Sequence, residues 1–180
     1  MIDALYSTRI LTLAANLPHS GRLPEPSPDV RFGTGEKVAK LCGSRAIVDV
    51  ILDDTDRVVA FAQDIKACAL GQAAAGVLGE SVIGASIDEI ETSRDAMVAM
   101  LKSGGEGPAG RFEGLRALQQ VADYPARHAS TLVAVEATLE AARQAAQRVS
   151  TRTSLAARPE GPTPVTSGLT PGCPARRDAG

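Results

Sequence analysis

Apolar positions along the chain follow helical spacing in some segments and strand-like alternation in others. Near the N-terminus, Ile2, Ile10 and Leu13 belong to a stripe at three- and four-residue spacing that predicts a helix. Residues 17–36 contain four prolines and three glycines, so we expect a loop that includes at most one short extended piece. The chain is therefore predicted to begin with a helix and a long connection.

Two segments with alternating apolar residues follow, and together they predict a β-hairpin. Residues 45–52 and 57–67 carry apolar side chains at every second position and are separated by the polar turn at residues 53–56. If Leu52 faces Arg57, antiparallel pairing places Val48 opposite Phe61. The same register puts Cys42 opposite Ala67, one position from Cys68.

Helical patterns dominate the rest of the folded part. Residues 69–79 are almost entirely alanine and glycine, which allows close packing against a neighbour. The sequence SIDE at residues 86–89 is a capping box, and the helix it begins is expected to end at Gly104. A short helix is predicted around residues 112–118, and the last helix is predicted to begin at Pro125. These elements predict an α+β fold in which helices cover one face of a small antiparallel sheet.

The C-terminal segment has a different composition from the rest of the chain. Residues 150–180 are rich in proline, glycine, serine and threonine and contain few apolar side chains. Such a segment cannot bury enough surface to offset the entropy lost on ordering. We therefore predict one folded domain at residues 1–149 and a disordered tail at residues 150–180.

Composition excludes several classes of protein. The net charge of −2, the aromatic content of 3% and the lack of tryptophan argue against a nucleic-acid-binding surface. No apolar run reaches the roughly 18 residues needed to span a membrane, and the N-terminus lacks the basic start of a signal peptide. An odd number of cysteines, three, favours a reduced cytoplasmic protein with metal-binding or reactive thiols.

Two of the cysteines are candidate site residues. Opposed residues of an antiparallel ladder lie about 4.5–5.5 Å apart, so Cys42 and Cys68 are expected within reach of a shared metal ion or of sulfur transfer. Cys68 precedes a helix, where the helix dipole favours the thiolate, and Gly43 lets the backbone turn beside Cys42. The alternative is that both are small buried hydrophobic residues. Cys173 lies in the predicted tail, where we expect no role.

A histidine is the candidate third ligand. His128 falls in or just before the first turn of the last helix, where the positive helix end favours a neutral, metal-binding imidazole. The alternative is a surface residue at a helix start. His19 lies in the loop and is expected to be solvated.

The order of these motifs resembles the NifU/IscU family of iron–sulfur cluster assembly scaffolds over about residues 5–145. The segment FGTGEKVAKLCGS resembles the family's GTG segment leading to Cys-Gly-Asp, and KACALGQAAAG resembles the segment around its second cysteine. YPARHASTLVAVEATLEAA resembles the closing helix of the family. The spacer at residues 102–127 resembles an insertion in the SufU branch.

The resemblance implies that Cys42, Cys68 and His128 hold iron, zinc or a nascent iron–sulfur cluster. It implies a scaffold and not an enzyme, with a cysteine desulfurase and cluster-acceptor proteins as partners. The resemblance also shows two departures: the chain has Ser44 where the family has aspartate, and Ala129 where the family has its third cysteine.

Three functions remain open on these grounds. The first is a scaffold that binds metal or cluster through Cys42, Cys68 and His128. The second is a persulfide acceptor with Cys68 as the nucleophile, receiving sulfur from a cysteine desulfurase. The third is a non-catalytic relative that acts by binding an assembly partner.

Overall fold

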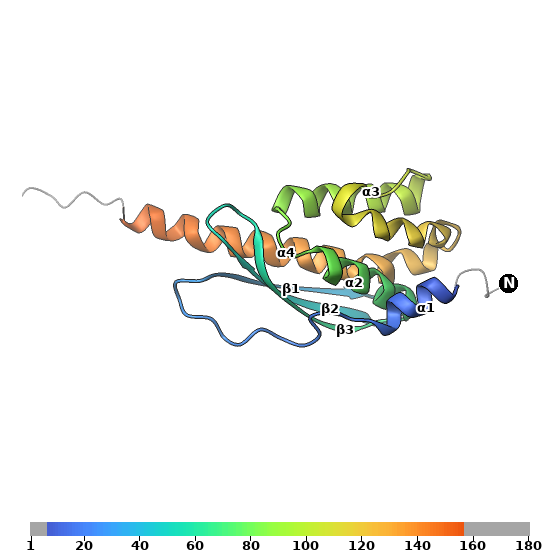
Figure 1. Ribbon diagram of the computed structural model, residues 1–180, viewed down its shortest axis with the longest axis horizontal. Coiled ribbons are helices and arrows are strands. Elements are labelled where there is room, and N and C mark those ends of the chain that lie inside the picture. Colours follow the sequence, from blue (N-terminus) through green and yellow to red (C-terminus); the bar gives the residue numbers. More distant parts are fainter. Residues whose placement is uncertain (1–6, 157–180) are drawn as a thin grey trace, which may run out of the picture.

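The computed structural model describes residues 7–156 and shows one antiparallel sheet packed against helices (Figure 1). The sheet has three strands in the order β1-β2-β3. The predicted α+β fold is confirmed. The elements in chain order are α1 (Thr8–Ala15), β1 (Arg31–Ala39), β2 (Ser44–Leu52), β3 (Val58–Lys66), α2 (Ala69–Ser81), α3 (Ile87–Ser103), the 3-10 helix η1 (Gly110–Asp123) and α4 (Pro125–Ala156).

The described residues begin just before α1 and end with α4. The N-terminal helix begins after Ser7, whose Oγ accepts a hydrogen bond of 3.4 Å from the amide of Ile10. The start of the predicted apolar stripe, including Ile2, lies outside the described residues. Helix α4 is described as far as Ala156, and residues 157–180 of the predicted tail also lie outside. No helix in the described range combines the length and hydropathy that a bilayer span requires.

The predicted hairpin is confirmed, but its register is shifted by two residues. Val48 pairs with Gln63 and not with Phe61. One residue of the shift comes from the turn, because the Asp53 amide bonds the Arg57 carbonyl at 2.9 Å and β3 starts only at Val58. The second comes from a bulge beside Leu52.

Residues 31–36 of strand β1 fall in the segment predicted as loop, where at most one short extended piece was expected. Its glycines allow the backbone of α4 to lie directly on the strand, as the close approach of the two elements in Figure 1 indicates. A Cβ added at Gly33 would lie 2.0 Å from the carbonyl oxygen of Ala141, and one at Gly35 would lie 2.0 Å from that of Ala137. Residues that look like loop formers in the sequence are therefore required here by packing.

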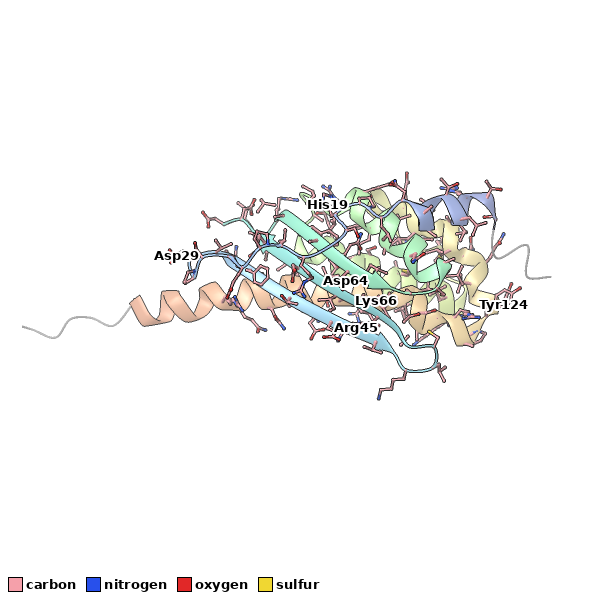
Figure 2. All side chains as sticks on the ribbon, turned by 90° about the horizontal axis from the view of Figure 1, so that it is seen from below. His19, Asp29, Arg45, Asp64, Lys66 and Tyr124 are labelled. Atoms are coloured by element: carbon pink, nitrogen blue, oxygen red, sulfur yellow. The ribbon has the colours of Figure 1, made fainter. Side chains whose placement is uncertain are left out.

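The connection before β1 lies on the sheet face that the helices leave open, as Figure 2 shows between His19 and Asp29. The guanidinium of Arg22 donates two hydrogen bonds, of 2.6 and 2.8 Å, to the carboxylate of Asp49. The Asp49 side chain is fully buried and also accepts from the hydroxyl of Thr34 and the amide of Leu23. This buried carboxylate anchors the long connection to the middle strand.

Helices α3 and η1 form a second layer above α4 (Figure 1). The predicted capping box is present: Ser86 Oγ accepts from the amide of Glu89 at 3.2 Å, and Glu89 Oε2 accepts from the amide of Ser86 at 2.8 Å. In η1 a constant three-residue spacing matches the period of a 3-10 helix and buries one row of side chains. That row consists of Phe112, Leu115, Leu118 and Val121.

Candidate functional site

The candidate site lies at one end of the sheet, where three segments meet. The turn at residues 40–43 joins β1 to β2 and carries Cys42, whose side chain is exposed. The amides of Cys42 and Gly43 both bond the carbonyl of Ala39, at 3.3 and 2.9 Å. Gly43 has a φ of +69° with no atom near the place of a Cβ, so the turn needs glycine for its backbone angle alone.

Cys68 lies at the joint between β3 and α2. It is the N-cap residue of α2, with an extended backbone (φ −65°, ψ 167°) and no side-chain capping bond. The Cys68 side chain is half-buried and packs against the hydrophobic core. The position of the thiol is therefore set by the joint between β3 and α2, and its side chain does not cap the helix.

Ser130 of α4 lies beside Cys68 and also affects Cys42. Its side chain is fully buried, and its Oγ lies 3.5 Å from Cys68 Sγ and 2.9 Å from the carbonyl oxygen of Arg127. The same hydroxyl is one of the groups that lower the pKa of the Cys42 thiol. Ser130 thus contributes to the surroundings of both cysteines from a third segment.

Ser44 completes this arrangement, which we call the thiol–hydroxyl cluster (Cys42, Ser44, Cys68 and Ser130). Cys42 Sγ lies 3.1 Å from the oxygen of Ser44, a buried side chain at the start of β2. Hydrogen bonds from the side chain and backbone of Ser44 lower the pKa of the Cys42 thiol, aided by Ser130 and by the positive charge of Arg127. The cluster therefore favours a thiolate on its exposed cysteine.

The structure does not bring His128 to the thiols. His128 Nε2 lies 3.1 Å from the carbonyl oxygen of Val121 and 3.2 Å from that of Ala122, so this nitrogen carries the proton as a donor. The imidazole lines a separate cavity of about 460 Å³ with Lys37 and Lys102. Within residues 7–156, no three histidine, cysteine or acidic side chains are grouped to bind a metal ion.

Ala129, where the resemblance places the third cysteine of the family, is exposed. The α4 residue that contacts Cys68 is its neighbour Ser130. The reason is helical phase: successive residues of a helix point about 100° apart, and Ser130 shares a face with Ala137, seven residues later. Since Ala137 lies against Gly35 of β1, this face is directed at the sheet. That phase is the signal by which the sequence could have identified Ser130.

Comparison with known proteins agrees with this architecture. The family model described as "NifU-like N terminal domain" matches residues 5–131. A crystal structure of the N-terminal part of a nitrogen-fixing NifU-like protein from Brucella abortus is 43% identical, with a TM-score of 0.74, and the match covers 81% of this chain and 97% of that one. Comparison with curated proteins gave no match.

A more distant structure shares the fold. It comes from Fervidobacterium islandicum AW-1 and is described as an iron–sulfur cluster assembly scaffold protein for the SUF system. It is 20% identical, with a TM-score of 0.67, and the match covers 77% of this chain and 97% of that one. The resemblance seen in the motifs is thus confirmed: the chain belongs to the NifU-like N-terminal domain family.

Proposed function

We propose that the protein is a scaffold on which an iron–sulfur cluster is assembled, with Cys42 and Cys68 holding the iron. The observation that carries this proposal is the place of Ser130, whose hydroxyl lies 3.5 Å from Cys68 Sγ and helps to lower the pKa of the Cys42 thiol. Two sulfur donors from separate segments then lie near one side chain. Membership of a family whose solved structures include one described as an iron–sulfur scaffold supports it.

The donor set suits a cargo that is held only for a time. Iron–sulfur clusters are bound through cysteine thiolates, and the lowered pKa of Cys42 favours that form. Two thiolates leave further iron positions open to incoming sulfide or to the ligands of an acceptor. Exposure of Cys42 gives a partner protein access to the cargo.

In this proposal His128 becomes a ligand only when its imidazole turns toward the thiols. Its Nε2 is held by two carbonyl oxygens, which leaves Nδ1 as the nitrogen with a free lone pair. Turning of the imidazole toward Cys42 and Cys68 would give the two-thiolate, one-imidazole set that also suits zinc. Iron and zinc are therefore the two metals to compare.

The residues near Cys42 offer exposed apolar surface to which a partner protein can bind. Leu41, next to Cys42, is 83% exposed, and Val38 is 52% exposed. We propose that a cysteine desulfurase supplies sulfur at this surface and that acceptor proteins receive the cluster here. The protein itself then catalyses no reaction and provides the ligands.

Anaerobic reconstitution tests the proposal. The full-length protein is incubated with ferrous iron and sulfide, desalted, and assayed for iron, sulfide and visible absorption. We expect bound iron in the parent and in Cys173→Ser, and its loss in Cys42→Ser and in Cys68→Ser. Equal iron in all four proteins would refute a site at Cys42 and Cys68, and no iron in any would leave partner binding as the function.

A second candidate function is acceptance of persulfide sulfur, and the exposure and lowered pKa of Cys42 favour it. The Cys42 thiolate would attack the outer sulfur of a desulfurase persulfide, forming a persulfide on Cys42 and releasing the desulfurase thiolate. This assigns the nucleophile to Cys42, whereas the sequence suggested Cys68. Incubation with a cysteine desulfurase and cysteine should label Cys42 with sulfane sulfur, and labelling confined to Cys68 would refute the assignment.

A further inference from the structure

Both thiols of the cluster lie near one hydroxyl. Cys68 Sγ lies 3.5 Å from Ser130 Oγ, and Ser130 is among the groups that lower the pKa of the Cys42 thiol. A disulfide needs a sulfur separation of about 2 Å, so the turn that carries Cys42 must move for the bond to form.

The backbone favours that movement. Arg45 pairs with Lys66 at the end of the β2–β3 ladder, three residues after Cys42 and two residues before Cys68. Both cysteines thus lie at the same end of the sheet, on the segments that continue two neighbouring strands. Since nothing packs against Gly43, the turn is free of side-chain obstruction there.

The two cysteines differ in access to reagents. Cys42 is exposed on the turn, whereas Cys68 is half-buried against the core. An external reagent therefore meets Cys42 first, and Cys68 is placed to attack afterwards. This is the arrangement of a reactive thiol beside a resolving thiol.

We propose that Cys42 and Cys68 form a reversible dithiol–disulfide pair that is oxidised by a low-molecular-weight disulfide such as glutathione disulfide. The Cys42 thiolate attacks one sulfur of the reagent, forming a mixed disulfide and releasing one glutathione. Cys68 then attacks the Cys42 sulfur, closing the protein disulfide and releasing the second glutathione. The protein loses two electrons and two protons, and one glutathione disulfide becomes two glutathione molecules.

The oxidised state has a consequence that rests on the proposed function. A disulfide sulfur is a poor metal ligand compared with a thiolate, so the oxidised protein cannot hold iron at Cys42 and Cys68. Return of the dithiol by excess glutathione would restore the ligands. Cys42 and Cys68 would then bind iron only under reducing conditions.

Oxidation of the metal-free Cys173→Ser protein tests the pair without metal. The protein is reduced, treated with glutathione disulfide over time, quenched by alkylation and mapped by peptide mass spectrometry. We expect a Cys42–Cys68 disulfide with no glutathione retained. Adding Cys68→Ser should trap a stable glutathione adduct on Cys42, and adding Cys42→Ser should slow modification of Cys68 at least about tenfold.

The outcomes separate this inference from the proposed function. Retention of glutathione on Cys42 while Cys68 remains free would overturn the pair, as would equal modification rates for the two single cysteines. Iron reconstitution of the reduced protein is measured in parallel and depends on no disulfide. A disulfide without iron binding would sink only the scaffold proposal, and iron binding without a disulfide would sink only the redox pair.

Discussion

Ser130 Oγ lies 3.5 Å from Cys68 Sγ, although 62 residues separate them along the chain. The contact brings the first turns of α4 to the N-terminus of α2, and the same hydroxyl helps to lower the pKa of the Cys42 thiol. A buried hydroxyl thus stands where a third sulfur could complete the site. Replacing the Oγ of Ser130 with sulfur would change the donor at this position and leave the rest of the side chain as it is.

Replacing that oxygen with sulfur should strengthen metal binding. In Ser130→Cys a third thiolate would join Cys42 and Cys68, and soft thiolate donors favour zinc and iron. We expect zinc affinity to rise at least about tenfold over the parent, measured by competition with a chromophoric chelator. The parent value sets the reference.

Ala129→Cys is the matched control for this change. It adds the same thiol one residue earlier, on an exposed position. We expect zinc affinity close to that of the parent, since the new thiol points about 100° away around the helix. Equal gains in Ala129→Cys and Ser130→Cys would contradict the placement of Ser130 at the thiols.

The lowered pKa of Cys42 predicts alkylation at an unusually low pH. A free cysteine reacts with half-maximal rate near pH 8.5, and we expect the midpoint of Cys42 to lie below that value. Ser44→Ala removes the leading cause of the shift, so its midpoint should move up. Iodoacetamide rates across pH, measured with Cys68 and Cys173 replaced by serine, provide the comparison, and identical profiles with and without Ser44 would rule out its role.

The ion pair between the buried Asp49 and the exposed Arg22 predicts acid sensitivity. Burial alone would raise the pKa of Asp49, but hydrogen bonds from Arg22, Thr34 and the Leu23 amide outweigh it and lower the pKa. A carboxylate with a lowered folded pKa stabilises the fold above its unfolded pKa of about 3.9, and this stability is lost as the pH falls through the folded value.

Arg22→Met tests this pair. The variant leaves the buried carboxylate without its cation, and we expect a loss of about 2 kcal/mol at neutral pH. Its acid transition should also shift to higher pH, because the Asp49 pKa rises. Urea unfolding between about pH 3 and pH 7 measures both effects. Unchanged stability and an unchanged acid transition would show that Arg22 contributes nothing.

The contact between β1 and α4 predicts an intolerance of side chains at Gly35. In Gly35→Ala the new Cβ would lie 2.0 Å from the Ala137 carbonyl oxygen, so α4 must move away from the strand. We expect a loss of about 3 kcal/mol or failure to fold, followed by thermal unfolding. Glu36→Ala, on the exposed face of the same strand, should cost less than about 1 kcal/mol, and a similar loss in both would contradict the packing argument.

The sequence predicted most elements because their patterns are local. The hairpin, the capping box at Ser86 and Glu89 and the start of α4 at Pro125 each depend on neighbouring residues. Strand β1 was missed because Gly33 and Gly35 are explained only by a helix more than 100 residues later. The register was wrong because the turn extends to Arg57 and a bulge lies beside Leu52, and neither leaves a local sign in the residue pattern.

The candidate site was predicted in part for the same reason. A hairpin places Cys42 and Cys68 at the same end of the sheet even with its register shifted, because its last pair, Arg45 and Lys66, lies within three residues of both cysteines. Placing Ser130 required the rotational phase of α4 against the sheet. His128 was placed near the thiols by its position in the chain, but the carbonyl oxygens of η1 hold its imidazole elsewhere.

The anchored connection before β1 also affects how this protein can meet other chains. The amide of Gln63 bonds the carbonyl of His19 at 2.9 Å, and its carbonyl accepts from the amide of Gly21 at 2.9 Å. These are the outward groups of β3 with which a foreign strand would begin to pair. With both already used within the chain, the middle of this edge is closed to edge-to-edge association, and the protein is protected there from aggregation through its own sheet.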